Sequence, residues 1–345
     1  MQWITWKPRK IRAEAVTANL AFVQSNYELI VSREQDFYHG ERPSASIPGI
    51  FTYWAVKYLS PRLREMFNAA SIEEFYANEI ERVAPDGPLS ILSLGSGEAS
   101  TELEIAIILV ARGRTVKFYG TDISPAMSEA GRQNAEAKGL ANSFEFLTCD
   151  INKQFPPTDA TIVLANHSLH HFVELEFIFS NVRRQIGAEG AFITNDMIGR
   201  NGHQRWPEVR GFVEAFWRLL PVDKRVDRIH NIRKMEFKDF DCANGTFEGI
   251  RAQDILPLCL QTFNFERFLG TGGIPDVFLD RMYGGNFSHD DPVDTAFVDV
   301  LENTNTSLAL LGLVKPTIMF ATMRNKPIEC AYWPAHPSVA MRHPD

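Results

Sequence analysis

Three of the nine histidines of this chain lie within five positions, in the segment ANHSLHHF at residues 165–172. Imidazole nitrogens can bind a metal ion, move a proton or hold a substrate. His167, His170 and His171 can approach one another if a helical turn begins near Ser168, so a metal site is geometrically allowed. No HExxH or HxH motif accompanies them. The chemistry that these histidines serve therefore depends on the elements around them.

The composition is that of a soluble globular enzyme, with 345 residues, 45% hydrophobic and 23% charged. A formal net charge of −8 argues against nucleic acid as a partner. The four cysteines are scattered without a CxxC pair, so the sequence suggests neither a disulfide framework nor a zinc ribbon and fits a reducing cytoplasm. No apolar run approaches the roughly 18 residues of a membrane helix. We expect a cytoplasmic protein without a membrane partner.

The pattern of apolar residues along the chain changes near residue 86. Residues 1–85 have helical spacing of apolar side chains, and we expect them to form a helical region that acts as a lid. From Leu89, short apolar runs alternate with amphipathic helices, which is typical of parallel β/α units. Seven strands are expected, in the segments LSILSL, VKFYGTD, SFEFLTCD, ATIVLAN, AFITND, FERFLG and PTIMFATMRN.

Two insertions interrupt the predicted main domain at 86–325. One follows the fifth strand at 200–250, where an amphipathic helix begins at Trp206-Pro207. The other lies between the last two strands at 271–315. We expect both to form a cap over the substrate, and we expect residues 326–345 to be an irregular tail.

A glycine turn, Gly95-Ser96-Gly97, lies between the first strand and its helix, where free backbone N–H groups allow close approach of a ligand. Asp122 follows the second strand, 27 residues after Gly95, where an acid can accept both hydroxyls of a ribose. Asp150 follows the third strand and can accept from an adenine amine. The residues after these acids, Ile123 and Ile151, could enclose the base.

With these segments, the chain resembles the class I S-adenosylmethionine-dependent methyltransferases of the small-molecule type. The resemblance is carried by LSLGSGEAS (92–100), YGTDISP (119–125), FLTCDI (146–151) and IVLANHSLHHF (162–172). It implies a doubly wound, seven-stranded Rossmann-like α/β sheet with an antiparallel last strand, and S-adenosylmethionine as the cofactor. The cofactor contacts that it implies, together with the adjacent positions, are Ser93, Gly95, Gly97, Asp122, Ile123, Asp150, Ile151 and Asn166.

The chain departs from the family's Asp/Glu-x-Gly-x-Gly-x-Gly pattern at two positions. Ser93 replaces the acid, so it would hold the cofactor's ammonium group more weakly, and Ala99 replaces the third glycine. A competing interpretation is an NAD(P)-dependent oxidoreductase, but its Gly-x-Gly-x-x-Gly motif would need glycine where this chain has Ser100. A cofactor-binding protein without catalysis is a second alternative, which the intact acids disfavour.

In that family, the residues after the fourth strand face the transferable methyl group. This position favours a pocket wall over a metal site for the three histidines, and no metal ion is expected. Either His170 or His171 would face the substrate, and Asp196, after the fifth strand, could serve as a base or bind an amine. Two structural histidines and a capping acid are the alternative interpretation.

The segment from Arg200 to Lys234 carries nine Lys/Arg and four Asp/Glu, a local balance of +5. Such a run is usually a solvated face, but RNGHQRW could form a lid that holds an anionic or carboxylate-bearing substrate. The substrate contacts we predict are Tyr38, His167, Asn195, Arg200, His203, Arg205 and Trp206.

These patterns together predict a small-molecule methyltransferase that acts on an O, N or S atom. A hydroxyl or ammonium acceptor would need a base, whereas a thioether would not. The N-terminal helices could also pair two subunits, so a homodimer is compatible with the sequence.

Overall fold

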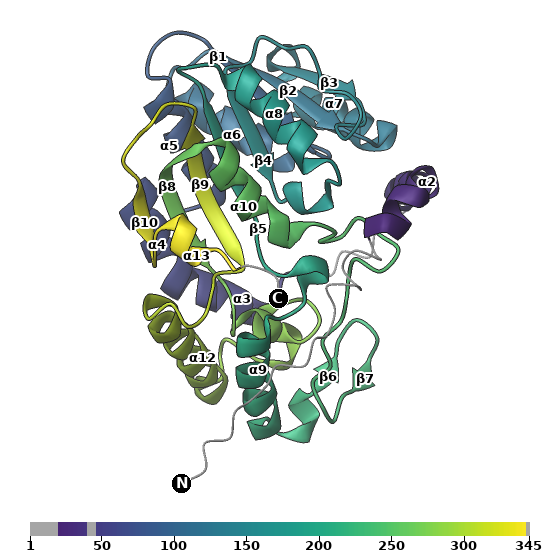
Figure 1. Cartoon of the computed structure of the whole chain (residues 1–345), viewed down its shortest axis with the longest axis vertical. Helices are drawn as coiled ribbons and strands as arrows, with labels where there is room; N and C mark the ends of the chain where they lie inside the picture. The colour runs from purple at the N-terminus through teal and green to yellow at the C-terminus, as the bar shows by residue number, and fades with distance from the viewer. Residues whose placement is uncertain (1–19, 40–45, 343–345) are drawn as a thin grey trace.

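In the computed structural model of the chain, which describes residues 20–39 and 46–342, eight strands pair into one central sheet (Figure 1). They are β1 (Leu89–Leu94), β2 (Val116–Asp122), β3 (Phe144–Thr148), β4 (Ile162–Asn166), β5 (Ala191–Met197), β8 (Asn264–Thr271), β9 (Ile318–Arg324) and β10 (Ala331–Trp333). Their order across the sheet is β10-β8-β9-β5-β4-β1-β2-β3.

The pairing confirms the predicted doubly wound sheet. Strands β1 to β5 are mutually parallel, whereas β9 runs antiparallel to both β5 and β8. The predicted count of seven strands is wrong by one, because β10 pairs in parallel with β8. The tail is also not irregular throughout, since it forms β10 and a short helix, α13 (Pro337–Ala340). A strand of three residues is too short to show an alternation pattern in the sequence.

Helices cover both faces of the sheet. One face packs against α4 (Ser60–Phe67), α5 (Ile72–Val83), α6 (Ser100–Ala111) and α7 (Pro125–Ala137), and the other against α8 (Leu175–Ile186), α10 (Ala252–Thr262) and α13. Ser124 caps α7, because its side chain accepts from the Met127 amide, and Pro125 occupies the first turn. Fully buried aromatic side chains such as Phe118 and Phe192 fill the two cores.

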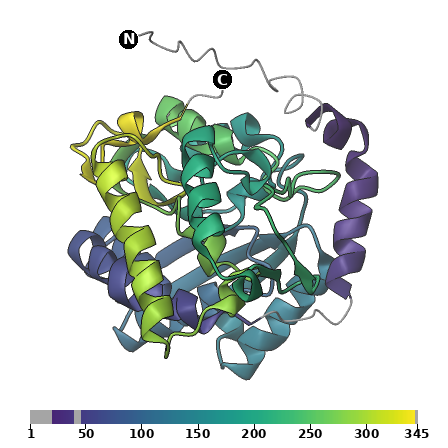
Figure 2. The same ribbon diagram turned by 90° about the horizontal axis from the view of Figure 1, so that it is seen from below.

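A second group of elements lies beyond the carboxyl ends of the parallel strands and is called the cap here (Figures 1 and 2). It consists of α3 (Gly49–Trp54), α9 (Pro207–Leu219), the hairpin β6 (Val226–Asp227) and β7 (Ile232–Arg233), α11 (Asp276–Leu279) and α12 (Pro292–Leu310). Its own core contains Trp54, Trp206 and Trp217. The two predicted insertions thus share one core with a helix from the N-terminal region.

The helix α2 (Tyr27–His39) lies apart from the other N-terminal helices, along one side of the molecule (Figure 2). It belongs to a small apolar cluster in which Val23 and Ile30 pack with Val173 and Phe247. None of the helices within the described ranges combines the length and apolar character that crossing a membrane requires. All four cysteines are free, as the sequence predicts.

Candidate functional site

The glycine turn after β1 opens onto a cavity of about 300 Å³. Gly95 and Gly97 both have positive φ, +67° and +56°, where glycine is the least strained residue. A Cβ on Gly95 would lie 2.8 Å from the Ser168 Cβ, so the turn packs tightly against the segment after β4. A Cβ on Gly97 would meet nothing within 4 Å. Gly97 therefore leaves the floor of the cavity open for a ligand.

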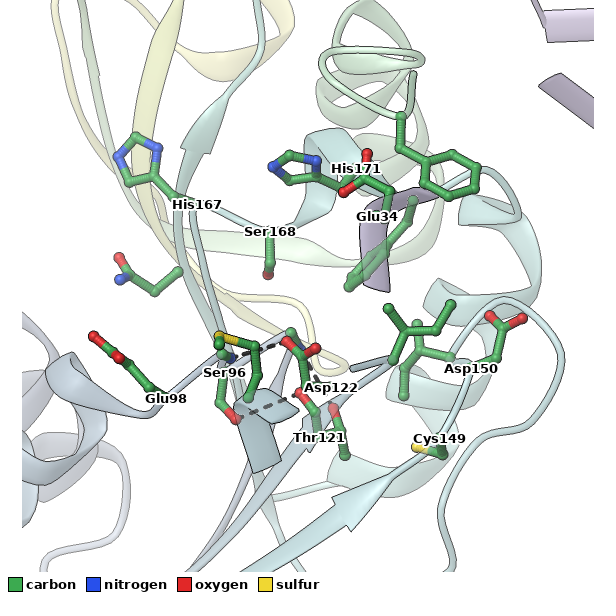
Figure 3. A pocket seen from close by; sticks show the side chains of 18 of the residues that line it. Glu34, Ser96, Glu98, Thr121, Asp122, Cys149, Asp150, His167, Ser168 and His171 are labelled. Atoms are coloured by element: carbon green, nitrogen blue, oxygen red, sulfur yellow. Dashed lines mark hydrogen bonds between the residues drawn. The ribbon is translucent and has the colours of Figure 1, made fainter. Parts of the chain in front are cut away.

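Asp122 lies at the end of β2 and lines the same cavity (Figure 3). Its carboxylate accepts from the Gly97 amide at 3.0 Å and from the Ser124 amide at 2.8 Å. These bonds link the glycine turn to the start of α7 and fix the position of the acid. The arrangement places a negative charge beside the open face of the turn, where a diol could donate to it.

Asp150 lines the cavity at the end where α2 covers it. Its Oδ1 accepts from the Tyr27 hydroxyl at 2.8 Å and from the Asn152 amide at 3.1 Å, and Lys153 lies 3.3 Å from Oδ2. Burial and the bond to Asp150 raise the pKa of Tyr27. Part of the hydrogen-bonding capacity of Asp150 is therefore used to hold α2 in place.

A second contact fixes α2, because Gln35 donates to the Ile123 carbonyl at 2.8 Å. Glu34 from the same helix lines the cavity. The sequence prediction of an N-terminal lid pointed to Tyr38 instead. The side chain of Tyr38 lies outside the described residues. The contacts of Tyr27, Glu34 and Gln35 are therefore the observations that make α2 a cover of the cavity.

Glu102, from the first turn of α6, supplies an acid that sequence reasoning missed. It lines the cavity, whereas Ser93 does not. The Ser93 hydroxyl donates to Glu102 Oε1 at 2.6 Å, and both side chains are buried. Burial raises the pKa of Glu102. The position at which the family has an acid thus holds a serine that orients an acid from the next element.

Asn166 ends β4 and lines the cavity beside the glycine turn. Its amide nitrogen donates to the Thr101 hydroxyl at 3.2 Å, and its oxygen accepts from the Tyr76 hydroxyl at 3.3 Å. Two helices, α5 and α6, therefore hold the Asn166 amide in one orientation.

The histidines after β4 meet two carboxylates. His170 is buried, and its Nδ1 lies 2.6 Å from Asp196 Oδ1. Asp196 also accepts from the backbone amides of Ser168, Leu169 and Met197 at 2.7–2.9 Å. Although burial raises the pKa of Asp196, interaction with His170 lowers it below the usual value. Asp196 is fully buried and enclosed by these donors, so its geometry suits orienting His170 rather than reaching a substrate.

Glu248, from the loop before α10, faces three imidazoles. Its Oε1 lies 2.7 Å from His203 Nε2 and 3.6 Å from His170 Nε2, and its Oε2 lies 3.5 Å from His171 Nε2. Burial alone would raise the pKa of Glu248, but the bond from His203 and the nearby His171 lower it to about 2. We call these four residues the histidine cluster. Of its members, only His171 lines the cavity.

Burial lowers the pKa of His171 to about 4, so its ring is neutral at pH 7. His167 lines the cavity as well, and burial also lowers its pKa. Figure 3 shows both rings on the side of the cavity opposite Thr121.

Comparison with known families identifies the part of the chain that holds this cavity. A family profile described as "Methyltransferase domain" matches residues 86–210. Residues 86–210 match a methyltransferase domain, and we use this name for them below. This match confirms the resemblance that the glycine turn and the two strand-end acids carry.

Solved structures resemble the chain more distantly. A geranyl diphosphate C-methyltransferase from Streptomyces coelicolor A3(2) is 13% identical over 74% of this chain and 81% of its own, with a TM-score of 0.40. The O-methyltransferase segment of StiE is 14% identical over 86% of each chain, with a TM-score of 0.41. The cyclase SpnF is 14% identical over 81% of this chain and 96% of its own, with a TM-score of 0.41. These values are too low to assign an activity, and a search of curated proteins finds no match.

Within the methyltransferase domain, seven of the eight predicted cofactor contacts line the cavity, with Ser93 as the exception. The predicted substrate contacts are more dispersed, since among those whose side chains the structure describes, His167 alone lines it. Asn195 is 1% exposed, and both polar atoms of its amide lack a partner among the described residues.

The basic segment RNGHQRW is divided by the fold. His203 joins the histidine cluster, whereas Trp206 lies in the apolar core of the cap. Arg200 donates to the Arg205 carbonyl at 3.3 Å, and the Arg205 amide donates to Asp239 at 2.7 Å. Neither arginine lines the cavity, so the structure does not bring the predicted anion-binding group together at this site.

Glu248 lies outside the methyltransferase domain, in the loop TFEGI between the hairpin and α10. Nothing in the local sequence distinguishes it from a surface acid, because the loop has no periodicity. The signal for Glu102 in the sequence was weak, because the segment TELEIAIILV begins with two acids, Glu102 and Glu104, and only the structure shows which of them is buried.

Proposed function

We propose that this chain transfers a methyl group from S-adenosylmethionine to a hydroxyl or amine of a small molecule. The observation that carries the proposal is the convergence of Gly95, Gly97 and the two strand-end acids on one cavity that ends at the ring of His171. The methyltransferase domain supports the reaction class. The cavity of about 300 Å³ is in the size range of small-molecule sites.

The residues on the cofactor side fit the parts of S-adenosylmethionine. Gly97 leaves room for the methionine portion, and Asp122 would accept from the ribose hydroxyls. Ile123 and Ile151 would enclose the adenine, with Asp150 at its amine. Glu102 takes the place of the missing motif acid and would pair with the ammonium group, with Ser93 holding its carboxylate.

The residues on the acceptor side of the cavity distinguish a hydroxyl or amine acceptor from a thioether acceptor. S-adenosylmethionine supplies an activated methyl group, so the chain must mainly align the acceptor with it and exclude water. The neutral ring of His171 borders the cavity and would accept a hydrogen bond from an O–H or N–H acceptor. A thioether has no proton to donate to this ring, so a hydroxyl or amine acceptor fits the site better. Arg200 and Arg205 do not line the cavity, so we propose a substrate without an anionic group.

Titration calorimetry with S-adenosylmethionine tests the proposal. Wild-type protein should bind the cofactor, and Asp122→Asn should weaken binding by at least about 10-fold, since a bond to a charged acceptor contributes about 1.5–3 kcal/mol. The matched control is Asp159→Asn, because Asp159 also accepts from side-chain hydroxyls but lies outside the cavity. Absence of binding by folded wild-type protein would refute the proposed function.

A further inference from the structure

Three potential metal ligands converge at the histidine cluster. A ring nitrogen of His170, a ring nitrogen of His203 and a carboxylate oxygen of Glu248 all lie within 4.8 Å of one another. They come from three separate segments, namely the turn after β4, the loop before α9 and the loop before α10. We propose that His170, His203 and Glu248 bind one divalent transition-metal ion, for which Zn²⁺ is the best match.

The spacing of the ligand atoms fits a small cation. A zinc ion has ligand bonds of about 2.0–2.2 Å, which in a tetrahedral site separates neighbouring ligand atoms by about 3.4 Å. Glu248 Oε1 lies 2.7 Å from His203 Nε2 and 3.6 Å from His170 Nε2, on either side of that value. A shift of side-chain torsions alone would close such a site.

Nδ1 of His170, the ring nitrogen that would not bind the metal, is held by a carboxylate, as is usual in metal sites. It faces Asp196 Oδ1 at 2.6 Å, and Asp196 is itself fixed by three backbone amides. A carboxylate on the far ring nitrogen is the usual outer partner of a metal-binding histidine, because it fixes the tautomer and leaves Nε2 with a lone pair. Nε2 of His170 lies 3.6 Å from Glu248 Oε1, which is longer than a charge-assisted hydrogen bond and leaves room for a cation to draw the two groups together.

The backbone around His203 is also unusual. His203 has a φ of +54° and Gly202 one of +62°, in a region that residues with a side chain rarely adopt. A Cβ on Gly202 would lie 1.9 Å from Asp241 Oδ1, so this bend is enforced by close packing. Strained backbone of this kind persists where the surrounding structure requires it, and here it directs His203 toward Glu248.

The position of the site gives the metal a role, and this part of the inference rests on the proposed methyl transfer. His171 belongs to the cluster and also lines the cavity, and its Nε2 lies 3.5 Å from Glu248 Oε2. A cation with three protein ligands keeps one position open, which an acceptor hydroxyl could fill. Lewis-acid contact lowers the pKa of such a hydroxyl. The O–H bond breaks with loss of the proton to water, the O–methyl bond forms, and the sulfur–methyl bond breaks to leave a neutral thioether.

Metal binding is measured without reference to activity. Tag-free, chelator-treated protein is titrated with Zn²⁺ by calorimetry and with Co²⁺ by visible absorption, and folding is checked by circular dichroism. Wild-type protein should bind one equivalent and give a cobalt spectrum of low-symmetry coordination. His203→Ala and Glu248→Gln should each weaken Zn²⁺ binding by at least 100-fold. The control is His230→Ala, because His230 also pairs with an aspartate, at 2.9 Å from Asp227, but lies outside the cluster.

The outcomes separate this inference from the proposed function. If folded wild-type protein binds no Zn²⁺, or if His203→Ala binds it equally well, the metal site is refuted, whatever calorimetry shows for S-adenosylmethionine. If Zn²⁺ binds and S-adenosylmethionine does not, the metal site stands and the proposed methyl transfer falls.

Discussion

At the scale of single residues, Ser93 stands at the motif position where the family has an acid, and we propose that Glu102 takes the role of that acid. Glu102 lies in the first turn of α6 and lines the cavity, and a hydrogen bond of 2.6 Å from Ser93 orients its carboxyl group. A motif within one strand does not reveal this exchange, because Ser93 and Glu102 are nine residues apart and belong to different elements.

Substitution of Glu102 tests the exchange. Glu102→Gln should weaken S-adenosylmethionine binding by about 10- to 100-fold, because a hydrogen bond to a charged group contributes about 1.5–3 kcal/mol. Glu104→Gln is the matched control, since Glu104 lies on the same helix but pairs with Lys138 at the surface. Equal affinities of the two variants in calorimetry would contradict the assigned role of Glu102.

Residues after the strands were predictable because parallel strands bring their carboxyl ends to one edge. Gly95, Asp122 and Asp150 all line the cavity because each of them follows a parallel strand of the sheet. Glu248 and His203 were not predictable as a pair, since only the fold of the insertion brings them within 2.7 Å. The same holds for Trp206, whose aromatic ring looked available for a ligand but fills the core of the cap.

At the scale of elements, α2 covers one end of the cavity. Side-chain bonds from Tyr27 to Asp150, from Gln35 to Ile123 and from Lys153 to Glu28, together with a small apolar cluster, hold it in place. A helix held by a small apolar cluster and side-chain bonds opens at lower free energy than the elements of the main core. Because Asp150 both anchors α2 and lines the cavity, we expect ligand binding and the closure of α2 to be coupled.

Hydrogen exchange measures this coupling. Tyr27→Phe should raise the exchange rates of the α2 amides by about 5-fold, corresponding to about 1 kcal/mol for one side-chain hydrogen bond, with little change elsewhere. In Tyr119→Phe, which removes an exposed tyrosine–aspartate bond of 3.1 Å on the sheet, α2 should exchange as in wild type. Unchanged α2 exchange in Tyr27→Phe would show that the hydroxyl does not hold the helix.

At the scale of the whole molecule, the cap carries a partly buried acid that makes stability depend on pH. Burial raises the pKa of Asp280, which directly follows α11, from 3.8 to about 6. The folded state therefore binds more protons than the unfolded state between these values, so this group lowers the free energy of unfolding as pH rises from about 4 to about 6. The loss amounts to at most about 3 kcal/mol, since one pKa unit corresponds to about 1.4 kcal/mol.

Asp280→Asn removes this titration while keeping an oxygen for the Met282 and Tyr283 amides. Relative to wild type, the variant should gain stability as pH rises from 4 to 7, as measured by denaturant unfolding at each pH. Asp299→Asn should behave in the opposite sense and at lower pH, losing stability relative to wild type as pH rises through about 4, because hydrogen bonds from Lys57 and Tyr58 outweigh burial and lower the pKa of Asp299 below 3.8. A constant difference between Asp280→Asn and wild type over this range would contradict the assignment.

The overall sheet was predictable because its alternation of strands and helices extends over more than 100 residues, whereas its last strand was not. That strand, β10, has a consequence for how copies of the chain can meet. It covers the outer edge of β8 over three residues and ends before Pro334, which has no N–H to donate. A short edge that ends in proline is a poor template for a strand from another molecule. Aggregation by extension of the sheet is therefore disfavoured on this side, and the opposite edge, at β3, is where such growth would have to begin.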